Sequence, residues 1–150
     1  RSTCRFPPMR RAAASRGRTV YFISCGELLN NLRRAKSENR LEYRLRHYFS
    51  YSLLIIDEVG YLPFDPDAAD MLFELIARRY ETKSTIITTN KPFGKWGEML
   101  GDPMVANAML DRLLHHSKVF TITGPSFRTK DYNQGAGRSD APSADGASGK

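Results

Sequence analysis

Long apolar runs are missing from this 150-residue sequence. The longest purely aliphatic run is Leu53–Ile56, far below the roughly 20 residues that an α-helix needs to cross a bilayer. No segment has the apolar centre of a signal peptide. We therefore expect no membrane partner and a cytoplasmic location.

Cysteine is also scarce, since Cys4 and Cys25 are the only two. Their positions match no spacing that is typical of metal ligands, and two cysteines do not make a disulfide framework. The sequence therefore indicates neither a disulfide-stapled fold nor a cysteine-based zinc site.

Acidic residues are absent from positions 1–18, which carry six Arg. Residues 19–132 hold fifteen basic and fourteen acidic side chains, and residues 133–150 hold two of each. The formal net charge of +7 therefore comes almost entirely from the head of the chain. Such a basic arm either binds nucleic-acid phosphates without sequence preference or is a solvated tail without a partner.

The two ends of the chain differ in composition from its middle. Residues 1–18 show no strand or helix period, and residues 133–150 are dominated by Gly, Ala, Ser, Asp and Pro. We expect both ends to be disordered. Residues 19–132 are then the folded domain.

Within that domain, β-branched runs alternate with amphipathic stretches. Strands are expected at Thr19–Ile23, Leu53–Asp57, Ser84–Thr89 and Lys118–Thr123. Helices are expected from a Ser24 cap to about Lys36, at Arg40–Phe49, from an Asp65 cap to about Tyr80, and at Pro103–His115. This alternation predicts a three-layer α/β fold around a parallel sheet, with helices on both faces.

Two carboxylates end the most apolar of these strands, because Leu53–Ile56 runs directly into Asp57 and Glu58. In an open parallel sheet, ligands bind at the C-terminal ends of the strands. One carboxylate can hold Mg²⁺ on a nucleotide, and its neighbour can orient or deprotonate an attacking water. This is the chemistry of a Walker B strand, and the alternative is a core strand that runs into a polar turn.

Two further residues are candidates for the same site. Asn90 follows Ser84–Thr89, and its amide either hydrogen-bonds a γ-phosphate oxygen or simply begins a turn. Arg112 lies in an apolar helix pattern, where it either makes a structural ion pair or reaches a neighbouring subunit as an arginine finger. His115 and His116 are adjacent, so on a helix they should face different ways and form no ready metal pair.

Six motifs in order resemble one family. They are LLIIDEVGYLPF (53–64), LFELIARRY (72–80), STIITTN (84–90), PFGKWG (92–97), GDP (101–103) and LDRLLHHS (110–117). Together they resemble the IstB-like ATP-binding proteins, which are AAA+ ATPases encoded beside a transposase in insertion sequences and related to DnaC-type helicase loaders. The resemblance covers about residues 19–132.

The resemblance implies roles for five residues. Asp57 corresponds to the Walker B acid at the Mg²⁺ site, and Glu58 to the catalytic glutamate. Asn90 corresponds to sensor 1 and Arg112 to an arginine finger that acts in trans. Arg128 matches a late Arg of the family and, with Asp57 and Asn90, is expected to bind the nucleotide. The implied cofactors are ATP and Mg²⁺, and the implied partners are DNA, the transposase of the same element and further copies of the chain.

One family motif is missing. The P-loop, G-x-x-x-x-G-K-[ST], should precede Thr19–Ile23, and no Lys of this sequence stands in that pattern. The P-loop supplies the N–H groups and the Lys that hold the β- and γ-phosphates. In the family's strand order, 5-1-4-3-2, strand 1 and the following helix are therefore absent, and Ser84–Thr89 becomes an apolar, unpaired edge.

Several interpretations of function stay open. The chain is an IstB-like AAA+ ATPase that helps a transposase, or a truncated, non-enzymatic remnant with at most weak nucleic-acid binding, or a DnaC-like helicase loader in replication. A second polypeptide that carries a P-loop could also complete the site. We expect the isolated chain to bind ATP poorly and to hydrolyse it negligibly.

Overall fold

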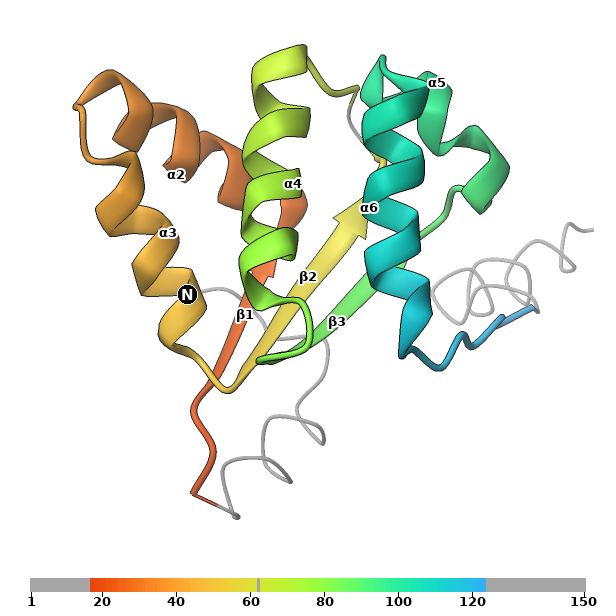
Figure 1. The fold of residues 1–150 in the computed structure, drawn as a ribbon, viewed down its shortest axis with the longest axis horizontal. Helices are drawn as coiled ribbons and strands as arrows, with labels where there is room; N and C mark the ends of the chain where they lie inside the picture. Colours follow the sequence, from red (N-terminus) through yellow and green to blue (C-terminus); the bar gives the residue numbers. More distant parts are fainter. Residues whose placement is uncertain (1–16, 62, 124–150) are drawn as a thin grey trace, which may run out of the picture. The chain divides into compact units, whose positions relative to one another are not determined.

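A three-stranded parallel sheet forms the centre of the structure, a computed structural model that describes residues 17–61 and 63–123. Its strands are β1 (Val20–Ser24), β2 (Leu53–Val59) and β3 (Ser84–Thr89), in the order β1-β2-β3 (Figure 1). Both pairs are parallel, and Phe22, Ile55 and Ile86 lie opposite one another in register. The predicted parallel pairing of these strands is confirmed. Arg128, most of the head and the whole tail lie outside the described residues.

Two of the helices begin directly after the capping residues that the sequence predicts, Ser24 and Asp65. The helices are α2 (Cys25–Ser37), α3 (Leu41–Ser50), α4 (Pro66–Arg79), the 3₁₀ turn η1 (Phe93–Lys95), α5 (Trp96–Leu100) and α6 (Pro103–His115). The Ser24 hydroxyl accepts from the Glu27 N–H at 3.3 Å, and the Asp65 carboxylate accepts from the Ala68 N–H at 2.8 Å. These bonds satisfy N–H groups that have no partner inside the helix.

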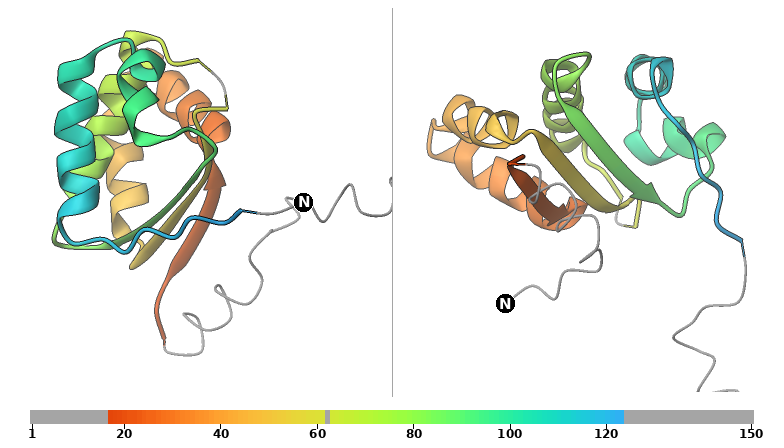
Figure 2. Two further views of the ribbon diagram at one scale, coloured as in Figure 1. Left: turned by 90° about the vertical axis from the view of Figure 1, so that its right-hand side faces the viewer. Right: turned by 90° about the horizontal axis from the view of Figure 1, so that it is seen from below.

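The described helices cover one face of the sheet (Figure 2). The chain moves from β1 to β2 to β3 in one direction across the sheet, and right-handed crossovers then place the connecting helices on the same side. Ile23, Leu54 and Ile56 face these helices and are at most 1% exposed. No described helix is long and apolar enough to cross a membrane. The α/β class is confirmed, and the helix layer expected on the other face is not among the described residues.

The strand predicted at Lys118–Thr123 is wrong. Residues 117–123 are exposed and form neither helix nor strand. From Val119 the chain belongs to a second unit. In the family's strand order this strand pairs with the P-loop strand, and residues 17–61 and 63–123 contain no such neighbour to accept its hydrogen bonds.

The expectation that His115 and His116 face different ways is also wrong. It applied helix geometry to both residues, but α6 ends at His115, as predicted, and the cap residue His116 has a φ of −124° and a ψ of 35°. The two imidazole rings therefore lie together, with their centroids 4.0 Å apart.

Candidate functional site

The two predicted carboxylates lie where β2 leaves the sheet. Asp57 is buried, with 7% of its surface exposed, whereas the Glu58 side chain is exposed. Glu58 has a φ of +61°, in the left-handed region that residues other than glycine rarely adopt. The β2–β3 register also shifts between Ile56 and Val59. An irregularity of this kind re-aims side chains, and here it separates a buried acid from an exposed one.

Gly60 completes this turn with a φ of +88°. A Cβ atom at this position would lie 2.5 Å from Met99 Sδ and 2.8 Å from Lys91 Cγ. Both the backbone angle and the lack of space therefore require glycine directly after the candidate site.

Thr88 on β3 links the two acids. Its hydroxyl donates to Asp57 Oδ1 and accepts from the Glu58 N–H at 3.0 Å. One hydroxyl thus orients the Asp57 carboxylate and holds the backbone of the next residue. The sequence did not single out Thr88, because a Thr in a β-branched run indicates only a strand. The available signal was its position two residues before Asn90, which places Thr88 near the end of the same strand and so near the predicted site.

Asn90 directly follows β3. Because Thr89 pairs with Val59 in the parallel register, Asn90 lies at the same edge of the sheet as the end of β2. Its side chain is exposed. The register thus brings Asp57, Glu58 and Asn90 to one edge, and their individual roles stay predictions.

Arg112 lies away from this edge. It is half-buried on α6, donates to the Ala108 carbonyl at 2.8 Å, and has its guanidinium carbon 5.0 Å from the centre of the Phe73 ring. The next turn of α6 contacts Tyr80, which precedes β3. Arg112 therefore packs against the middle of α4, one helical turn before the end of α6 that contacts Tyr80.

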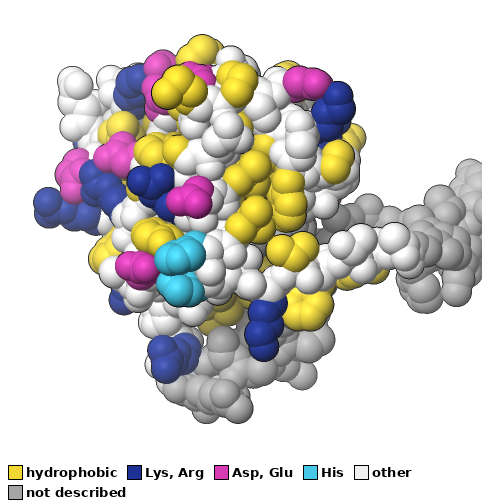
Figure 3. Space-filling model, turned by 45° about the vertical axis from the view of Figure 1, so that its right-hand side comes forward, with side chains coloured by type: hydrophobic (Ala, Val, Ile, Leu, Met, Phe, Trp, Pro, Cys, Tyr) yellow, Lys and Arg dark blue, Asp and Glu magenta, His cyan; other side chains and the backbone are white. Residues whose placement is uncertain are grey.

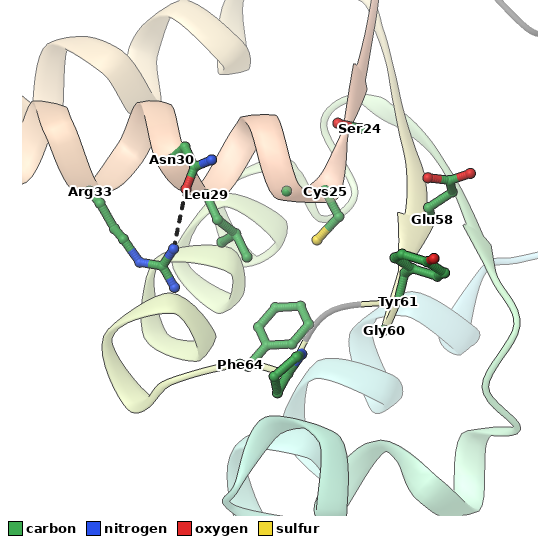
Figure 4. A pocket seen from close by; sticks show the side chains of 11 residues that line it. Ser24, Cys25, Leu29, Asn30, Arg33, Glu58, Gly60, Tyr61 and Phe64 are labelled. Atoms are coloured by element: carbon green, nitrogen blue, oxygen red, sulfur yellow. Dashed lines mark hydrogen bonds between the residues drawn. The ribbon is translucent and has the colours of Figure 1, made fainter.

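An open cavity of about 170 Å³ lies beside Glu58, between the start of α2 and the loop that follows β2. Figure 4 shows Glu58 and Tyr61 on the β2 side and Arg33 on the α2 side. Arg33 donates to Asn30 Oδ1 at 3.4 Å and forms an ion pair with Asp65. The volume is below the roughly 300 Å³ at which pockets for small molecules begin.

Two titratable groups in or next to the cavity, Cys25 in its lining and Asp65 paired with the lining residue Arg33, have structural functions. The pKa of Asp65 is lowered, chiefly because its carboxylate accepts the Ala68 N–H at the start of α4. Burial raises the pKa of the Cys25 thiol to about 12, which makes it a poor nucleophile. Neither Asp65 nor Cys25 is therefore a candidate catalytic group. Among the residues that line the cavity, the candidate is Glu58.

The donor set at the end of β2 fits one part of a Mg²⁺–nucleotide site. Mg²⁺ prefers oxygen ligands, and Asp57, Glu58 and Thr88 supply carboxylate and hydroxyl oxygens there. Among the described residues no glycine-rich turn followed by Lys and Ser or Thr accompanies them. The site thus has donors for the metal and for water, without the expected phosphate cradle.

Comparison with protein families matches residues 8–135 to the family of IstB-like ATP-binding proteins. The chain is 58% identical to a putative ATP-binding protein of insertion sequence IS232 from Bacillus thuringiensis over 121 residues, which are 81% of this chain and 48% of that protein. It is 52% identical to a putative ATP-binding protein of insertion sequence IS5376 from Geobacillus stearothermophilus, over 79% of this chain and 47% of that protein. The chain therefore spans about half the length of the curated relatives it matches.

Solved structures show the same fold at low sequence identity. The DnaC helicase loader superposes with a TM-score of 0.55 at 22% identity, over 66% of this chain and 60% of that one. AMPPCP-bound DnaA from Aquifex aeolicus superposes with a TM-score of 0.54 at 18% identity, over 65% of this chain and 31% of that one. At these identities the likeness shows a shared fold.

Proposed function

Because the chain belongs to the family of IstB-like ATP-binding proteins, we propose that it carries the metal-binding and water-activating half of an ATPase site used in DNA transposition. The observation that carries this proposal is the Asp57–Glu58 pair at the C-terminal end of a parallel strand, joined to β3 through the Thr88 hydroxyl. That arrangement presents two carboxylates at the edge of the sheet where ligands bind.

Each site residue then has a distinct task. Asp57, oriented by Thr88, would hold Mg²⁺, which neutralises phosphate charge when it is bound. Glu58, exposed at the turn, orients the attacking water and accepts its proton. Asn90 donates its amide to a γ-phosphate oxygen.

The two arginines are assigned differently. The Arg112 side chain packs on Phe73 of α4 and donates to the Ala108 carbonyl, and neither residue belongs to the strand ends that carry Asp57 and Asn90; this suits an arginine finger that acts on the site of a neighbouring copy better than one that acts on its own site. Arg128 contributes a further positive charge to the nucleotide.

The partners follow from the family. We propose that copies of the chain assemble on DNA and assist the transposase of the same insertion sequence. The similar proteins named for insertion sequences support the transposition context. A DnaA structure with AMPPCP and single-stranded DNA has the same fold at 18% identity. The Arg-rich head supplies additional charge for phosphate contacts.

A second candidate function is a non-enzymatic remnant. One observation favours it: the cavity beside Glu58 has a volume of about 170 Å³, below the roughly 300 Å³ at which pockets for small molecules begin. Under either interpretation, the 150-residue chain alone should bind ATP poorly and hydrolyse it negligibly.

The first test is ATP binding by the purified chain with Mg²⁺, compared with Asp57→Ala. We expect no binding in the micromolar range, which corresponds to about −8 kcal/mol. Micromolar binding that depends on Asp57 would mean that another segment replaces the P-loop, and would overturn the proposed impairment.

A chimera separates the two candidate functions. The chain would be joined to the part of the Bacillus thuringiensis relative that precedes its matched region, which is expected to supply the phosphate cradle. We expect the chimera to hydrolyse ATP, and Glu58→Gln to abolish turnover while ATP binding is retained. A folded chimera that binds ATP without Glu58-dependent turnover would favour the remnant.

A further inference from the structure

Two helix ends lie side by side at the edge of the sheet where the strands begin. α4 ends at Arg79, and Glu81 follows with a φ of +58°, a left-handed conformation that is frequent just after helices. α6 ends at His115, with His116 as its cap. Contacts join the two ends, because Tyr80 Oη hydrogen-bonds His115 Nδ1 and His116 Nε2 lies 3.5 Å from Glu81 Oε1.

The spacing of these side chains matches that of metal ligands. Glu81, His115 and His116 each offer one ligand atom, and these atoms all lie within 4.8 Å of one another. In a tetrahedral site with bonds of 2.0–2.2 Å, ligand atoms are about 3.4 Å apart. The Glu81–His116 pair is already at this distance, at 3.5 Å. All three side chains are exposed, so small rotations can bring His115 into place.

The chemistry of the three groups selects a class of metal ion. Two imidazoles and one carboxylate form the donor set that Zn²⁺ and neighbouring divalent transition metals prefer, whereas Mg²⁺ and Ca²⁺ prefer oxygen ligands alone. Three protein ligands leave a fourth position for water. Figure 3 shows histidine side chains together at the surface, with an acidic side chain beside them.

The surroundings favour a bound cation. The Tyr80 hydroxyl at His115 Nδ1 can fix the tautomer in which Nε2 faces the metal, as outer contacts of metal-binding histidines commonly do. The C-terminal ends of helices α4 and α6 also carry partial negative charge. Among the described residues, no other group of three His, Cys, Asp or Glu side chains comes this close together.

We propose that Glu81, His115 and His116 form a binding site for a divalent transition-metal ion such as Zn²⁺. The ion would tie the end of α4 to the end of α6. Since α6 carries Arg112, the site would hold in place the helix that presents this arginine. The site is separate from Asp57 and Glu58, which lie at the opposite end of the strands.

Zn²⁺ titration of the full, untagged chain by calorimetry tests the proposal, with Co²⁺ as a spectroscopic probe. We expect one Zn²⁺ per chain, a Co²⁺ spectrum with the intense visible bands of a tetrahedral site, and no competition from millimolar Mg²⁺. His115→Ala and His116→Ala should each weaken Zn²⁺ binding at least about tenfold. Glu81→Gln should weaken Zn²⁺ binding less, because the amide oxygen of Gln can still bind the ion, although more weakly than a carboxylate does.

His47→Gln is the matched control, because His47 is the third histidine of the sequence and lies outside the cluster. It should leave Zn²⁺ affinity unchanged. A second readout is thermal stability: Zn²⁺ should raise the Tm of the unchanged chain and not that of a His115→Ala, His116→Ala variant. No Zn²⁺ binding, or binding that survives the loss of both histidines through Cys4 or another group, would overturn the proposal.

Discussion

At the scale of single residues, Thr88 shows how the candidate site is held together. Asp57 and Glu58 are neighbours in the sequence, but the end of β2 separates them into a buried and an exposed side chain. The Thr88 hydroxyl contacts the carboxylate of one and the backbone N–H of the other. Thr88 therefore sets the position of both acids, and we expect it to act as a positioning residue in the proposed reaction.

Replacing Thr88 by Val should lower the free energy of unfolding by about 1–3 kcal/mol, because the Asp57 carboxylate and the Glu58 N–H each lose a partner in a partly buried site. Thr88→Ser keeps the hydroxyl and should retain most of the stability. Urea unfolding can be followed by the fluorescence of Trp96, the single tryptophan, which is 1% exposed. Equal stability of Thr88→Val and the unchanged chain would contradict this role.

At the scale of helices and strands, one buried arginine joins three elements. Arg79, the last residue of α4, is 1% exposed. Its guanidinium donates to the carbonyls of Tyr48 at 2.9 Å, Tyr51 at 3.0 Å and Ser84 at 2.6 Å. These carbonyls belong to α3, to the residue after it and to the start of β3. Burial lowers the pKa of Arg79 to about 10, which still leaves it charged at neutral pH.

Arg79→Met should therefore destabilise the fold by about 3 kcal/mol or more. The apolar side chain removes the cost of burying a charge but leaves several carbonyl groups unsatisfied, and each of those costs about 1–3 kcal/mol. Arg79→Lys should rescue only part of the loss, because an ammonium group has three donors and no planar fork. Urea unfolding of these variants gives the measurement.

Arg46→Met is the control for the loss of an arginine. Arg46 is an exposed residue of α3 that pairs with Glu42 at 2.9 Å, and such surface pairs contribute at most about 1 kcal/mol. If Arg79→Met and Arg46→Met had equal effects, the proposed function of Arg79 as a structural link would be wrong.

The sequence predicted features that depend on residues close together in the chain, and it missed features that depend on residues far apart. The Ser24 and Asp65 caps act within three residues of the chain, so the starts of α2 and α4 could be predicted. Thr88 and Arg79 act on groups about 30 residues away, which only the strand register and helix packing bring near. The end of α6 at His115 was predicted, but the contact between His115 and His116 depends on the backbone angles of the cap residue His116, which the sequence pattern does not give.

At the scale of the whole molecule, β3 is the feature with consequences for association. Within the described residues it has a hydrogen-bonded neighbour, β2, on one side only. Such an edge presents unpaired N–H and C=O groups to other chains. Successive side chains of a strand alternate between its faces, so Ile86 points away from the helices that Ile87 contacts. Ile86 is also partly exposed, which adds an apolar side chain to the open edge.

We expect the isolated chain to associate through this edge as its concentration rises. Ile86→Lys should raise the concentration at which association begins several-fold, because a charge on an edge strand opposes the pairing of two edges. Sedimentation velocity over a concentration series gives the measurement, and the fluorescence of Trp96 checks that the variant is folded.

Tyr43→Lys is the matched control, since Tyr43 is a 64% exposed apolar residue on α3, away from β3. If Tyr43→Lys reduced association as much as Ile86→Lys did, general surface hydrophobicity rather than the β3 edge would be responsible. If neither changed it, the chain would associate through another surface, and the open edge would not be what limits its solubility.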